Sequence, residues 1–75
     1  STLYERGIEI ARTHQLKYFL GVLLADQVEM LFELGEQSAA QQRLEEGLSL
    51  AREMNNEALI ARMQALQEQL PVKNP

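Results

Sequence analysis

Residues 17–34 are apolar around most of their circumference if they form a helix. Their clearest polar stripe consists of Asp26, Glu29 and Glu33, which share one helical face at spacings of i, i+3 and i+7. A helix with so wide an apolar surface must be covered by other elements on more than one side. We therefore predict that this segment is the central element of the fold, with further helices packed around it.

The rest of the chain also favours helices. Ala, Leu, Glu, Gln and Arg, which are good helix formers, dominate the 75 residues, and aromatic residues make up only 5%. Apolar and small residues recur at helical spacing between the turn-forming positions. The sequence therefore predicts an all-α fold of four helices, over residues 3–13, 17–34, 37–54 and 57–70.

Three short connections separate the predicted helices. The first is His14-Gln15-Leu16, and the second contains Gly35, a residue type that often ends a helix in a left-handed conformation. The third is Asn55-Asn56, where either asparagine can cap the next helix. Because the connections are short, consecutive helices are expected to be antiparallel neighbours. This gives one helical domain over residues 1–70, and residues 71–75 are expected to be a disordered tail.

An internal repeat appears when the chain is compared with itself at a shift of 40 residues. Gly7 and Ala11 then coincide with Gly47 and Ala51, so small residues recur where helices would cross closely. The first and third predicted turns coincide as well. Helix-turn-helix units repeated at such a period indicate an α-solenoid.

Residues 31–51, LFELGEQSAAQQRLEEGLSLA, place large and small side chains in a defined order. Leu24 and Leu31 are the large residues of the first helix, and Gly35 lies in the turn. The second helix has a small, large, small series and then two trailing apolar residues: Ala40, Leu44, Gly47, Leu48 and Leu50. In these positions the chain resembles the tetratricopeptide (TPR) repeat family. The longer period is similar to that of the extended repeats in bacterial signalling ATPases and transcriptional activators.

The resemblance covers one hairpin well and has departures. Gln27 stands where the family usually has leucine, Val28 stands at a small position, and Arg52 lies near the place of the usual closing proline. The resemblance implies that the flanking helices belong to a preceding and a following repeat. The residues expected to pack between repeats are Gly7, Ile8, Ile10, Ala11, Leu24, Leu31, Ala40, Leu44, Gly47, Leu48, Leu50 and Ala51.

By the same resemblance, the first helix of each hairpin lines a concave groove that binds a partner. The groove candidates are apolar or acidic, which favours a basic protein or peptide: Val22, Ala25, Glu29, Phe32 and Glu33. TPR domains that clamp a C-terminal carboxylate use lysine and asparagine from the groove. Ala25 and Glu29 occupy the matching positions here, so that type of recognition is not expected.

Composition and motifs exclude several other functions. A net charge of −4 argues against nucleic-acid binding, and polar faces that are not basic argue against membrane-surface binding. The chain has no cysteine, and His14 is its only histidine, so it offers neither a nucleophile with a base nor a thiolate metal site. The carboxylates at Asp26, Glu29, Glu33 and Glu36 are interpreted as a solvated face. We expect no enzyme activity, cofactor or metal.

A domain of this length buries only about 60% of its unfolded surface, and solenoids typically need about three repeats. Ile10 and Leu50 lie off the main stripes and are expected to bury against an adjacent helix. We therefore expect either a fragment of a longer array or a chain that self-associates. The first predicts a cytoplasmic, non-catalytic protein-binding module within a larger bacterial regulatory or signalling protein. The alternative is a structural segment that caps an array or forms a homo-oligomer, such as a homodimer.

Overall fold

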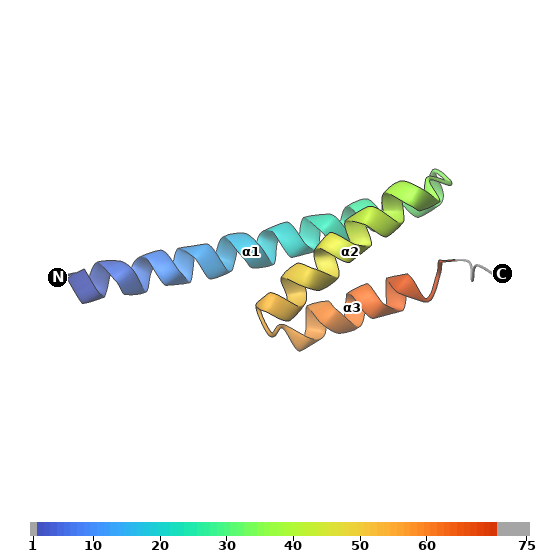
Figure 1. Cartoon of the computed structure of the whole chain (residues 1–75). Coiled ribbons are helices and arrows are strands. Elements are labelled where there is room, and N and C mark those ends of the chain that lie inside the picture. Colours follow the sequence, from blue (N-terminus) through green and yellow to red (C-terminus); the bar gives the residue numbers. More distant parts are fainter. Residues whose placement is uncertain (1, 71–75) are drawn as a thin grey trace.

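The computed structural model describes residues 2–70, apart from the side chain of Tyr4, and consists of helices joined by short turns (Figure 1). The helices are α1 (Thr2–Glu33), α2 (Gln37–Glu53) and α3 (Glu57–Gln67). Residues 2–70 contain no strand, which confirms the all-α class. Consecutive helices run antiparallel (Figure 1). The predicted tail, residues 71–75, lies outside the described residues.

The predicted number of helices is wrong, because α1 is one helix of 32 residues that passes through His14, Gln15 and Leu16 without a break. None of these three residues is the glycine or asparagine that usually ends a helix in a left-handed conformation, and none lacks a backbone N–H as proline does. The segments 3–13 and 17–34 therefore merge. The other two helices begin at the predicted residues and end slightly earlier, at Glu53 and Gln67.

The turn between α1 and α2 follows the prediction at Gly35. Its φ of 75° is left-handed. The Gly35 N–H donates to the Phe32 carbonyl at 3.1 Å, and the Glu36 N–H donates to the Leu31 carbonyl at 2.9 Å. These two bonds form a Schellman motif, which satisfies the carbonyl groups at the end of α1 and reverses the chain.

The turn between α2 and α3 has the same geometry without glycine. Asn55 takes a φ of 54°, and the N–H groups of Asn55 and Asn56 donate to the carbonyls of Arg52 and Ala51. The Asn56 side chain then accepts a hydrogen bond from the Leu59 N–H at 3.0 Å, which caps α3. Asparagine tolerates left-handed φ better than most residues, so the pair both ends one helix and begins the next.

The hydrophobic core lies where the three helices meet. It contains no buried polar side chain among the described residues. Partly buried apolar residues, including Leu31, Phe32 and Leu50, pack around it. The buried members come from all three helices: Leu24, Ala25, Val28, Ala40, Leu44, Leu48, Ala51, Leu59, Met63 and Leu66.

Two glycines allow the helices to approach closely. A Cβ atom on Gly21 would lie 2.5 Å from Cδ2 of Leu59, and one on Gly47 would lie 2.5 Å from Cε of Met63. A side chain at either position would require Leu59 or Met63 to shift, so each glycine lets its helix lie close against α3. The prediction that residues 17–34 are covered on more than one side is met only in part. Leu24, Ala25 and Val28 enter the core, whereas Leu20, Leu23 and Met30 of the same segment stay exposed.

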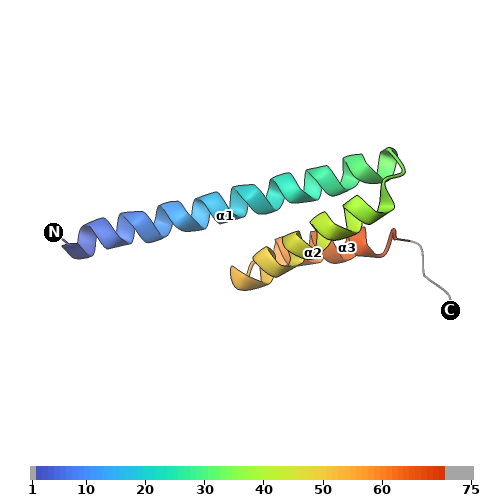
Figure 2. The ribbon, with the colours of Figure 1, turned by 45° about the horizontal axis from the view of Figure 1, so that its top comes forward.

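The first half of α1 extends beyond the other helices. Figures 1 and 2 show α2 and α3 lying against the second half of α1, while the N-terminal half stands alone. The described chain measures 57 × 21 × 18 Å. At about 1.5 Å per residue, a helix as long as α1 spans about 48 Å, so this one helix accounts for most of the long dimension.

Candidate interaction surface of helix α1

All five predicted groove residues lie on the second half of α1. Val22 and Phe32 are half-buried, whereas Glu29 and Glu33 are exposed. Ala25 is fully buried in the core and does not face solvent. The surface that remains available at the predicted groove therefore consists of two partly covered apolar side chains and two carboxylates.

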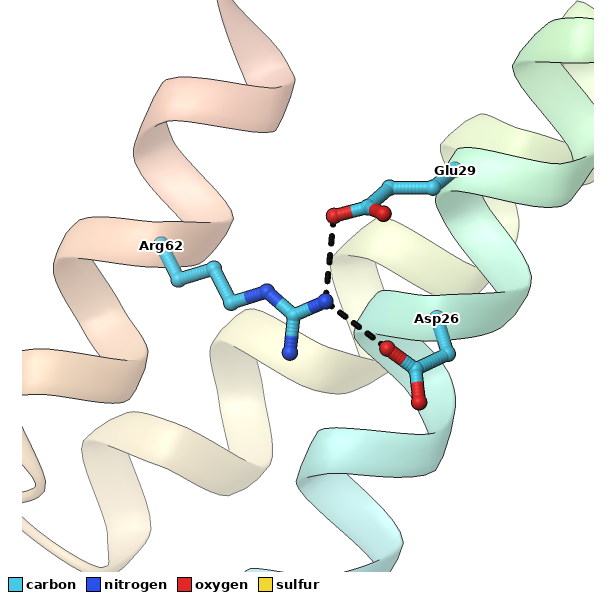
Figure 3. A network of polar contacts seen from close by, with 3 residues as sticks. All are labelled: Asp26, Glu29 and Arg62. Atoms are coloured by element: carbon cyan, nitrogen blue, oxygen red, sulfur yellow. Dashed lines mark hydrogen bonds and ion pairs between the residues drawn. The ribbon is translucent and has the colours of Figure 1, made fainter.

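One of those carboxylates is already engaged within the chain. The Nη2 atom of Arg62, on α3, lies 2.8 Å from Oδ1 of Asp26 and 3.0 Å from Oε1 of Glu29 (Figure 3). The hydrogen bonds to Asp26 and then to Glu29 raise the pKa of Arg62 above its ordinary value. The guanidinium thus offsets part of the negative charge that the sequence places on this face, and it ties α3 to α1.

Sequence reasoning missed this bridge. Arg62 is 33 and 36 residues away from its two partners, so no local spacing connects them. The spacing of Asp26, Glu29 and Glu33 predicted a solvated acidic face, and these side chains are exposed. It gave no sign of the arginine that pairs with the first two.

A second ion pair joins α1 to the end of α2. Nζ of Lys17 lies 2.8 Å from Oε1 of Glu53. This hydrogen bond, together with the positive charge of Lys17, lowers the pKa of Glu53. Both side chains are partly exposed to solvent. Because Glu53 is the last residue of α2, the pair lies where α1 begins to extend beyond the other helices.

The residues predicted to pack between repeats fall into two groups. Leu24, Ala40, Leu44, Gly47, Leu48 and Ala51 are buried, while Leu31 and Leu50 are half-buried against the core. Gly7, Ile8, Ile10 and Ala11 are exposed, because the helix on which they lie does not turn back. A packing role for these four stays a prediction that requires a neighbour from outside the described residues.

The most unusual feature of the surface is its large exposed apolar side chains. They all lie on α1 or directly after it: Leu3, Ile8, Ile10, Leu16, Tyr18, Phe19, Leu20, Leu23, Met30 and Leu34. Single exposed apolar residues are normal, but a contiguous set marks an interaction site or a liability to aggregate.

Five of these residues line one side of α1, together with Gln27, and we call this set the apolar stripe: Leu16, Leu20, Leu23, Gln27, Met30 and Leu34. The stripe includes an open depression of about 360 Å³ lined by Leu20, Leu23, Leu24, Asp26, Gln27 and Met30. The wide apolar surface of this segment predicted that other helices of the same chain would pack over these residues. Because α1 does not turn at residues 14–16, the segment before that point does not fold back to pack against them.

Residues 2–70 contain no group of three or more His, Asp or Glu side chains placed to hold a metal ion. His14 lies exposed on the protruding half of α1. None of the described helices combines the length and the apolar character needed to cross a membrane. What the arrangement offers chemically is apolar contact area beside carboxylates.

Comparison with protein-family models, with curated proteins and with solved structures finds no match to this chain.

Proposed function

We propose that the chain is a non-catalytic module that binds a protein or peptide, built as a TPR-like helical repeat within a larger regulatory or signalling protein. The pattern of residues 31–51 supports the repeat. So does the order of the helices, in which α1 and α2 form an antiparallel hairpin and α3 packs against both. The observation that carries a binding function is the row of large apolar side chains left exposed along α1.

Two surfaces of α1 are available to a partner. The predicted groove offers Val22 and Phe32 beside Glu33, which suits an apolar side chain next to a basic one. The apolar stripe offers more exposed apolar area, because its aliphatic residues range from 46% to 67% exposed. Burial of such area is the main favourable term in protein association.

Affinity capture with surface variants tests this function. The immobilised chain is exposed to a lysate of the source cells, and the proteins retained are compared between wild type, Leu23→Glu in the stripe and Glu33→Lys in the groove. Ser49→Glu, at an exposed position of α2, is the matched control. We expect a protein that wild type and the control retain and that one of the two α1 variants loses.

Circular dichroism of each variant shows whether the helices remain intact. If wild type retains nothing specific, or if both α1 variants retain the same proteins as the control, the proposed function is wrong.

A further inference from the structure

The residues of the apolar stripe are separated alternately by four and three positions. The separations along Leu16, Leu20, Leu23, Gln27, Met30 and Leu34 are 4, 3, 4, 3 and 4. This alternation is the heptad pattern by which one helix packs along another. Leu16, Leu23 and Met30 occupy the d positions, and the others occupy the a positions. The five aliphatic members remain half to two-thirds exposed, so the seam has no partner within the described chain.

The spacing of the stripe residues is the same whether it is counted from Leu16 or from Leu34. If a second copy lies antiparallel, with a two-fold axis passing near Ala25, each a position faces a d position of the other copy. Leu16 then lies opposite Leu34, and Leu20 lies opposite Met30. Such a surface is complementary to itself, which is what a two-fold symmetric interface requires.

The charges along α1 favour the same arrangement. Residues 2–17 carry three basic and two acidic side chains, whereas residues 26–36 carry four acidic side chains and no basic one. An antiparallel copy places the basic half of each α1 beside the acidic half of the other. A parallel copy would place the two acidic halves together, and like charges at that distance repel. Near the two-fold axis the two Asp26 side chains approach each other, and each is balanced by its own Arg62.

We propose that the apolar stripe is the docking site of a second copy of this chain, forming an antiparallel two-fold dimer along residues 16–33 of α1 and Leu34, the residue that follows it. The inference rests on the proposed function in that it names a partner for the same helix. The acidic residues that flank the stripe, Asp26 and Glu33, disfavour a membrane surface as the occupant, because membrane-binding helices carry basic flanks.

The size of the interface predicts a reversible dimer. Residues 16–34 extend for about 28 Å, and covering one third of the circumference of a helix about 11 Å across buries roughly 300–350 Å² per copy. The total of roughly 600–700 Å² lies below the range of stable specific interfaces, among weak and transient ones. The monomer and the dimer are therefore expected to exchange with concentration.

Sedimentation equilibrium of the 75-residue chain, from micromolar to millimolar concentration, measures the association. We expect a monomer–dimer equilibrium in wild type. Leu23→Glu is expected to weaken it by about a hundredfold or more, because it places a charge in each half of the seam. Gln27→Leu completes the stripe and is expected to strengthen the dimer by about tenfold or more. Ser49→Glu adds the same charge on α2 and is expected to leave association unchanged.

Single cysteines test the orientation, because the chain has none of its own. In an antiparallel dimer, a mixture of Leu16→Cys and Leu34→Cys chains forms a disulfide between the two variants, and neither variant links to itself. In a parallel dimer, each variant forms a disulfide with another copy of itself, and the mixture forms no disulfide between the two variants.

A folded wild-type chain that stays monomeric at every concentration overturns the inference, as does a dimer that Leu23→Glu leaves unchanged. Self-linking of Leu16→Cys overturns the antiparallel arrangement. These failures are distinct from failure of the proposed function: a monomeric chain that captures another protein through α1 rejects only the dimer. A chain that dimerises through the stripe and captures no other protein supports the inference, and it contradicts the proposal that α1 binds a different protein.

Discussion

The two halves of α1 belong to one helix and are held in place differently. From Gly21 onward the helix contributes Leu24, Ala25 and Val28 to the core, and Arg62 joins it to α3. In residues 2–20 no described side chain is buried, and Lys17 provides the only ion pair to another helix among the described residues. The same regular backbone therefore has tertiary support at one end and almost none at the other.

The contrast between the two halves shows that a sequence can favour a helix without packing contacts that stabilise it. Short helices are marginal in water, and most of their stability in proteins comes from packing of an apolar face. The first half of α1 is rich in residues that favour helix formation. Its helix can extend from the turns that are already formed and packed in the second half, so it needs no nucleus of its own. Its stability is then limited to what propensity supplies, unless another chain or segment covers its exposed residues.

Amide hydrogen exchange is expected to show the largest contrast between the halves. In a dilute, monomeric sample, amides of residues 22–33 exchange through global unfolding, which costs about 3–5 kcal/mol in a domain of this size. Amides of residues 6–14 exchange through local fraying that costs close to zero. Nuclear magnetic resonance exchange rates, residue by residue, measure this difference. Equal protection in the two halves would show that the first half is packed against something.

Truncation of one leucine in each half gives the next largest contrast. Leu24 is 7% exposed and Leu16 is 63% exposed. Leu24→Ala leaves a cavity between the helices and is expected to lower the free energy of unfolding by about 2–4 kcal/mol. Leu16→Ala is expected to change it by less than about 0.5 kcal/mol. Urea unfolding followed by circular dichroism measures both, and a comparable loss in the two variants contradicts the contrast.

Local sequence signals predicted the parts of the fold that depend on local chemistry. Gly35 and the Asn55-Asn56 pair ended helices as expected because each provides a residue that adopts left-handed φ at low cost. The buried face of α2 followed from helical spacing, with Ala40, Leu44 and Leu48 in the core.

The features that sequence reasoning missed depend on non-local information. The turn predicted at residues 14–16 coincides with the turn at residues 54–56 when the chain is shifted by 40 residues, but the first set has no asparagine and no glycine. Similar sequence periods do not imply similar turns when the residues that make the turn differ. The bridge from Arg62 to Asp26 and the exposure of the apolar stripe follow from how the helices are arranged, which no short spacing encodes. Leu50 is not among these features, because it was expected to bury against an adjacent helix and does pack against the core near Gly21 of α1.

Alanine at the two glycines of α1 is expected to have opposite effects. Gly7 has no atom near its missing Cβ, whereas Gly21 has Leu59 at 2.5 Å. Gly7→Ala removes the backbone entropy cost of glycine and is expected to stabilise the first half locally, by up to about 1 kcal/mol. Gly21→Ala makes the same gain but forces Leu59 to move, and the overpacking cost of about 1–3 kcal/mol is expected to exceed the gain, so that the fold is destabilised. The helical signal at 222 nm and the urea midpoint distinguish the two, and a stabilised Gly21→Ala variant would contradict the close approach of α1 and α3.

The smallest expected effect concerns the ion pair where the two halves meet. The hydrogen bond from Lys17 and its charge lower the pKa of Glu53 in the folded chain below its ordinary value of 4.5. A lowered pKa stabilises the fold at pH values above the unfolded pKa, and this stabilisation is lost as the pH falls through the folded pKa. Urea unfolding of wild type and Glu53→Gln between neutral pH and pH 3 isolates the effect, because the other carboxylates titrate in both chains. We expect the small advantage of wild type to disappear at the acid end and to shrink with added salt, since both partners face solvent. An advantage that does not change with pH would mean that Lys17 does not hold α1 to α2 in solution, and that the unsupported part of α1 begins closer to Gly21.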